Sequence, residues 1–98
     1  MKLQFSAELW EWEGQGAAWF FVSVPGDESE LIRSVPRPPK PGFGSLRVQA
    51  TIGSTTWSTS VFPDSKRDCY VLPVKKAVRS AEALEPGAQA HVTLLLVD

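Results

Sequence analysis

Apolar and polar residues alternate along much of the chain. The first such segment carries Leu3, Phe5, Ala7 and Leu9, with a polar residue between each pair. A period of two is typical of a strand with one buried face, so this segment predicts an opening strand. The alternation inverts at Trp10, which predicts either a bulge or a strand that leaves the rest of the sheet.

The same pattern, together with the turn-forming residues, predicts the remaining elements. Further strands are expected over residues 17–24, 46–52, 56–62, 70–72 and 88–97. A short helix is expected from Asp27, which could form a capping box with Glu30, and a second, amphipathic helix over residues 74–83. The proline-rich segment 36–44 is expected to form a stiff, exposed loop.

The order of these elements occurs twice. In each half a strand runs into a proline, Pro25 or Pro73, and a helix, a Pro-Gly turn and an alternating strand follow. Equivalent features lie 44 to 48 residues apart. The length of 98 residues predicts a single domain over residues 1–98, and the domain would consist of two β-β-α-β halves, about residues 3–53 and 54–97. The predicted fold is mainly β: a six-stranded double-split β-barrel with two short helices and an approximate twofold axis.

Three motifs, in order, resemble a bacterial domain-of-unknown-function family, number nineteen-oh-five. They are GFGSLRV at 42–48, IGSTTWSTSVFP at 52–63 and YVLPVKKAVR at 70–79. The resemblance covers nearly the whole chain; it implies the double-split barrel and no particular reaction. The last third is also similar in layout to AbrB/MazE-type swapped-hairpin barrels, in which two chains form what one chain would form here. This second likeness concerns the fold, and function does not follow from it.

Composition narrows the class of protein. The 98 residues carry 10 basic and 11 acidic side chains, for a net charge of −1, so nothing in the balance calls for nucleic acid or an acidic membrane. Hydrophobic residues make up 43% of the chain, which fits a globular domain. One cysteine, no recognisable signal peptide and no long apolar run predict a cytoplasmic protein without a membrane segment. Either a monomer or a homodimer is compatible with the sequence.

The start of the second predicted helix is unusually basic. It carries Lys75, Lys76 and Arg79, although cations are unfavourable at the positive end of a helix dipole. Such a start could hold an external anion, and Arg47 could join it from the polar face of its strand. The ordinary alternative is that all of these are solvated surface charges.

A larger basic patch is the basis of a second hypothesis. Lys66 and Arg67 precede the strand that leads into the basic helix and could extend it into a phosphate-binding patch. The chain would then be a nucleic-acid-binding regulator of the swapped-hairpin kind. The acidic start of the first helix and the net charge count against this alternative, so nucleic acid is not the expected partner.

Four tryptophans are many for this length. Trp10, Trp12, Trp19 and Trp57 could line a barrel mouth and stack on a sugar or a base, or they could close the core and the barrel ends. Trp10 and Trp12 fall on the face opposite the apolar residues of the first strand, and are therefore predicted to form a contact surface if exposed.

No constellation of catalytic or metal-binding residues is recognisable. His91 is expected to be exposed, because it is out of phase with the apolar positions of its strand, and Cys69 is expected to be a small strand residue. One histidine and one cysteine do not supply the usual ligands of a metal site. We therefore expect no catalysis, no metal and no cofactor. The expected function is a small binding or accessory module that takes an anionic ligand or a protein partner.

Overall fold

The computed structural model describes residues 1–14, 16–35 and 44–96. Six strands and two helices follow one another along these residues: β1 Lys2–Gly14, β2 Ala17–Ser23, α1 Gly26–Arg33, β3 Leu46–Ile52, β4 Thr55–Asp64, β5 Cys69–Pro73, α2 Lys76–Ala81 and β6 Gln89–Leu96. The predicted proline-rich loop, apart from its last residue, and the final residue of the predicted closing strand lie outside the described residues. No helix in the described part of the chain is long and apolar enough to cross a membrane.

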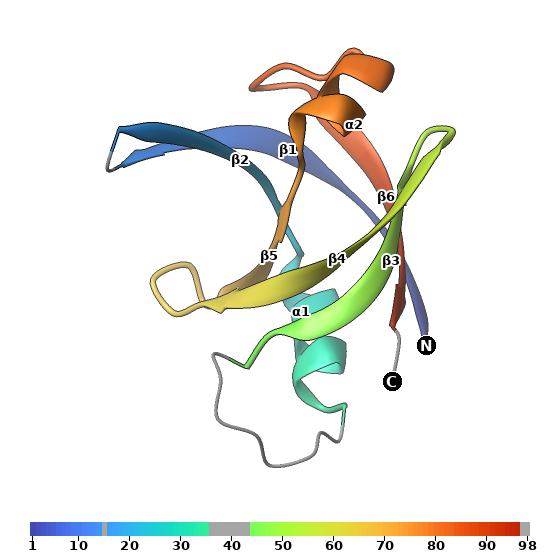
Figure 1. The fold of residues 1–98 in the computed structure, drawn as a ribbon. Coiled ribbons are helices and arrows are strands. Elements are labelled where there is room, and N and C mark those ends of the chain that lie inside the picture. The colour runs from blue at the N-terminus through green and yellow to red at the C-terminus, as the bar shows by residue number, and fades with distance from the viewer. Residues whose placement is uncertain (15, 36–43, 97–98) are drawn as a thin grey trace.

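The strands form a closed barrel in the order β1-β2-β5-β4-β3-β6 (Figure 1). All six neighbouring pairs are antiparallel. The alternating apolar residues point into the barrel, where Leu9, Val22, Leu72 and Leu94 are fully buried. The predicted mainly β, six-stranded barrel is therefore confirmed, and its interior is a packed apolar core.

The strand register displays the relation between the two halves. Where β2 meets β5, Val22 lies opposite Leu72, and the pairing is symmetric about these two residues. The Val24 N–H donates to the Tyr70 carbonyl at 2.8 Å, and its counterpart, the N–H of Val74, donates to the carbonyl of Phe20, also at 2.8 Å. Exchanging β1 with β4, β2 with β5 and β3 with β6 leaves the strand order unchanged.

The two helices lie at opposite ends of the barrel (Figure 1). The predicted capping box of α1 is wrong: the helix begins at Gly26 after Pro25, with no side-chain cap. Asp27 is thereby inside the first turn, and Glu30 pairs with Arg33 instead.

The second helix is shorter than predicted. It covers Lys76–Ala81 rather than residues 74–83, because the N–H of Val74 is still bonded to β2. At the other end Ala83 takes a positive φ of 53°, which cannot continue a helix. The helix therefore begins only after the chain has left the sheet.

The inverted pattern at Trp10 marks the point where β1 leaves the barrel wall. β1 pairs with β6 only as far as Glu8, and with β2 from Leu9 to Gly14. The β1–β2 hairpin consequently extends beyond the closed barrel (Figure 1). This confirms the prediction of a strand that departs from the wall and places a two-stranded arm at the side of the molecule.

Candidate functional site

The outer side of the β1–β2 hairpin is aromatic. Trp10 lies opposite Phe21, and Trp12 lies opposite Trp19. Leu9 and its partner on β2, Val22, are buried in the core. Side chains alternate between the two faces of a sheet, so these four rings point to the other, outer face. We call these four residues the aromatic face. Trp12 is 45% exposed and Trp19 is 53% exposed, so two large apolar side chains lie side by side in solvent.

The inner two rings of the aromatic face are held in place. The indole Nε1–H of Trp10 donates to the Ser23 hydroxyl at 2.9 Å, and its ring lies 5.0 Å from that of Phe21. Trp19 stacks on Phe21 with an interplanar angle of 13° and a centroid distance of 6.4 Å. These contacts fix the orientation of the surface before any partner arrives, which lowers the entropy lost on binding.

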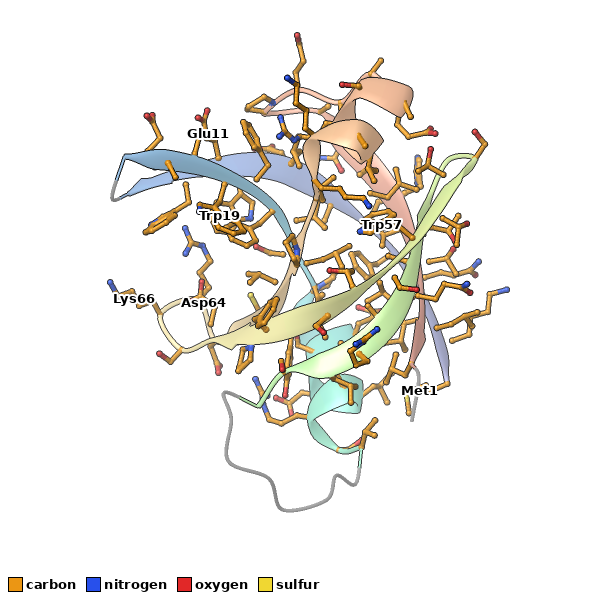
Figure 2. All side chains as sticks on the ribbon, in the orientation of Figure 1. Met1, Glu11, Trp19, Trp57, Asp64 and Lys66 are labelled. Atoms are coloured by element: carbon orange, nitrogen blue, oxygen red, sulfur yellow. The ribbon has the colours of Figure 1, made fainter. Side chains whose placement is uncertain are left out.

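The turn between β4 and β5 forms the opposite wall of a groove beside this face. Trp10, Trp12, Phe21 and Val71 line its apolar side, and Asp64, Lys66 and Arg67 line the other, around a cavity volume of about 290 Å³. Figure 2 shows Trp19 on the side of the hairpin that faces Asp64 and Lys66, whereas Glu11 points to the opposite side.

Asp64 organises this turn. Its carboxylate accepts the N–H groups of Lys66 and Arg67 at 3.0 and 3.3 Å, and the Arg67 guanidinium at 2.9 Å. Burial by itself would raise the pKa of Asp64, but the hydrogen bonds from Arg67 and from the two backbone groups outweigh it and lower the pKa. The same ion pair holds the guanidinium 4.0 Å from the centre of the Trp10 ring, a cation–π contact. The ammonium of Lys66 forms no ion pair among the described residues.

The structure does not bring the predicted basic residues together around one recess. Lys75 precedes α2 and lines a hollow with Trp57 and Thr59, whereas Lys76 and Arg79 line a second hollow on another side of the helix.

Two of the predicted cations have other surroundings. Arg79 donates from Nε to the Val74 carbonyl at 3.2 Å and covers the Phe20 ring at 3.7 Å. Arg47 is exposed on β3 opposite Ser60 and lines neither hollow. Anion binding at the start of α2 thus stays a prediction that involves two exposed lysines.

The tryptophans divide into one core residue and three on the hairpin. Trp57 is 9% exposed and belongs to the core, whereas Trp10 and Trp12 lie on the outer face. The condition that both be exposed is met by Trp12, while Trp10 is half-buried. The sequence placed Trp19 among four candidate tryptophans but assigned only Trp10 and Trp12 to the contact surface. The position of Trp19 could have been found from the glycine turn that follows Gly14, because a two-residue turn places Trp12 directly opposite Trp19.

Two potential nucleophiles are Ser6 and Cys69. Ser6 Oγ is 2.6 Å from His91 Nδ1, and the two residues are direct partners on the exposed outer side of the β1–β6 ladder. Burial raises the pKa of the Cys69 thiol, which lowers its thiolate fraction at neutral pH. The described residues include no cluster of three or more potential metal ligands.

Fold and groove together define a small closed-barrel domain with an aromatic surface outside the barrel. The sequence model of the family described as Domain of unknown function (DUF1905) matches residues 5–94. The chain therefore belongs to this family, as the three motifs indicated. A search of curated proteins found no significant match.

Proposed function

We propose that this domain is a non-catalytic interaction module that binds a protein partner through the aromatic face. The observation that carries the proposal is the adjacent exposure of Trp12 and Trp19 beside the fixed pair formed by Trp10 and Phe21. Exposed apolar patches of this kind are typical of interaction surfaces. The proposal places the module in the bacterial cytoplasm, in keeping with the family resemblance and the single cysteine.

The shape of the surface favours a macromolecular partner over a small ligand. Side chains fill the barrel interior, and the groove beside the aromatic face is open to solvent. Small ligands are usually enclosed on most sides, whereas protein interfaces are broad and rich in tryptophan, phenylalanine and arginine at their centres. Arg67 on the Trp10 ring completes that composition.

The energy available at this surface is large enough to measure. A tryptophan side chain buries roughly 150–250 Å², and Trp12 and Trp19 each keep about half of their surface exposed. Covering the remainder, about 100 Å² per ring, would contribute roughly 2.5 kcal/mol each. Losing one ring should therefore weaken binding by more than tenfold.

Selection from a library of displayed random 12-residue peptides tests the proposal. We expect the selected peptides to bind the natural domain and to lose at least tenfold in affinity for the Trp12→Ser/Trp19→Ser double variant. The matched control is the Lys75→Ala/Lys76→Ala double variant, which should bind them unchanged. Selected peptides that bind the tryptophan variant equally well would refute the proposal.

Anion binding at α2 remains the second candidate function. It is favoured by the two exposed lysines at a helix start that has no side-chain cap. Titration with inorganic phosphate, followed through the backbone amide signals of Lys75 and Lys76, tests it.

For the nucleic-acid alternative, affinity for DNA should fall steeply with added salt and should drop in the double lysine variant.

A further inference from the structure

One edge of the projecting hairpin has no partner strand. Beyond Glu8, β1 pairs with β2 alone, and no described segment pairs along its other side. The last backbone contacts on that side belong to Leu9, whose N–H donates to the Ala88 carbonyl at 2.9 Å and whose carbonyl accepts the N–H of Gly87 at 2.8 Å. The edge from Trp10 onward is therefore an open strand edge.

The alternation of hydrogen-bonding direction identifies the groups on this edge. In an antiparallel strand, successive residues direct their N–H and C=O groups to opposite sides. Because Leu9 bonds away from β2, Glu11 and Glu13 must present their N–H and C=O groups to the open edge. Trp10 and Trp12 direct theirs to β2. Glu11 and Glu13 together thus offer two N–H donors and two C=O acceptors to a strand that pairs along this edge.

The other half of the barrel has the equivalent edge, and there the chain blocks it. β4 pairs with β3 only as far as Val61, and then continues beside β5. Phe62 lies opposite Val71 in the way that Trp10 lies opposite Phe21, so Pro63 takes the position that Glu11 has in the first half. Proline has no N–H to offer and is a common means of blunting an edge strand.

We propose that the open edge of β1 binds an extended segment of the protein partner as an added antiparallel or parallel strand. This inference rests on the proposed function and names the binding mode. The partner segment would alternate: apolar side chains would extend the aromatic face beside Trp10 and Trp12, and basic side chains would lie beside Glu11 and Glu13 on the opposite side. Main-chain hydrogen bonds would supply affinity, and the alternating side chains would supply specificity.

Charge identifies the partner as basic. Glu11 and Glu13 are exposed, and neither forms an ion pair with another described residue. A second copy of this chain pairing through the same edge would bring these glutamates close to their own counterparts, and like charges opposite one another are destabilising. The same two side chains would attract lysine or arginine on an incoming strand.

A seven-residue peptide that alternates lysine and valine, blocked at both ends, is the probe. We expect the peptide to bind the natural domain and to protect the Glu11 and Glu13 amides from hydrogen exchange. The same peptide with glutamate in place of lysine, or with N-methylated amides on the pairing side, should lose at least about tenfold in affinity.

Two variants of the domain complete the test. Glu11→Pro transfers the natural block of the second half to the open edge, and it should lower peptide affinity about tenfold without removing a bond to β2. Glu11→Gln/Glu13→Gln should weaken binding while keeping the backbone groups. The matched control, Asp27→Asn/Glu28→Gln on α1, removes two carboxylates that form no ion pair with another described residue, and it should leave the peptide affinity unchanged. If Glu11→Pro does not fold, the N-methylated peptide and the charge variants still test whether the peptide binds as an added strand.

The outcomes separate the two proposals. Absence of binding, or equal binding by the N-methylated peptide, would overturn the strand-addition mode. Peptides selected on the aromatic face that bind Glu11→Pro unchanged would overturn it too, and would leave the proposed function intact. Edge protection that survives in Trp12→Ser/Trp19→Ser would instead support the added strand and contradict the role of the aromatic face.

Discussion

The substitution Ser29→Ala offers a direct test of how the helix α1 is fastened to the barrel. Ser29 is 1% exposed and is the buried polar side chain of the described core. Its hydroxyl donates to the Val24 carbonyl at 2.9 Å and accepts the N–H of Tyr70 at 3.0 Å. One side chain therefore links the first turn of α1 to the end of β2 and to β5.

The expected loss follows from these two bonds. Alanine removes the hydroxyl and leaves a buried carbonyl and a buried N–H without this partner. Each such loss costs about 1–3 kcal/mol, so the two together should lower the free energy of unfolding by about 2–6 kcal/mol. For a domain of this size, that corresponds to a decrease of roughly 10 °C or more in the melting temperature.

Urea unfolding followed by circular dichroism measures the loss, and Ser34→Ala is the matched control. The Ser34 hydroxyl also donates to a backbone carbonyl, that of Leu31 at 2.7 Å, but in an exposed position. Its removal should cost less than about 0.5 kcal/mol, because water replaces the bond. Equal losses in Ser29→Ala and Ser34→Ala would refute the reasoning, since the two differ mainly in burial.

Three further predictions concern the turns and the groove. Gly53→Ala should lower the free energy of unfolding by about 1–3 kcal/mol, measured by urea denaturation, because φ is +59° there and the new methyl would collide with the Glu82 carboxylate. Gly14→Ala should displace the Trp12 indole, whose ring covers the glycine, and should shift the indole N–H signal with little effect on stability. An unchanged signal would contradict the packing. The pKa of Asp64 is lowered below its ordinary value of 3.8, so its contribution to stability is present above that pH and is lost as the pH falls through the folded-state pKa. The stability advantage of the natural domain over Asp64→Asn should accordingly shrink below about pH 4 in acid titrations of unfolding.

The strands could be predicted from the sequence because they are specified locally, and the repeated order of elements, with the family resemblance, then indicated the barrel. A period of two fixes which residues face the core, and the inversion at Trp10 located the point where β1 departs from the wall. The start of α1 was predicted wrongly for a physical reason. Asp27 has the chemistry of a cap, but the helix begins before it. Val24 makes the last backbone bond to the sheet, through Tyr70, and Pro25 then takes the N-cap position.

The candidate site could be predicted only in part, because it depends on contacts between distant segments. The outward position of Trp12 follows from the pattern of its own strand. The placement of Arg67 over Trp10 depends on the barrel bringing the β4–β5 turn against the hairpin, which no local pattern encodes. For the same reason the sequence could not show that Arg79 folds back onto Phe20 instead of joining the two lysines.

The two halves of the barrel provide an internal comparison that separates folding from function. Both halves contribute equivalent contacts to the core. Val22 and Leu72, at the centre of the β2–β5 pairing, are both fully buried aliphatic residues. Outside the barrel the fold places no such demand, yet the halves differ there: Glu11 corresponds to Pro63. One half closes its edge, while the other carries an aromatic, acidic arm that the core does not require. This reasoning requires Trp12→Ser to leave stability nearly unchanged. A loss comparable to that of Ser29→Ala would show that the arm supports the fold, and the comparison would then carry no information about binding.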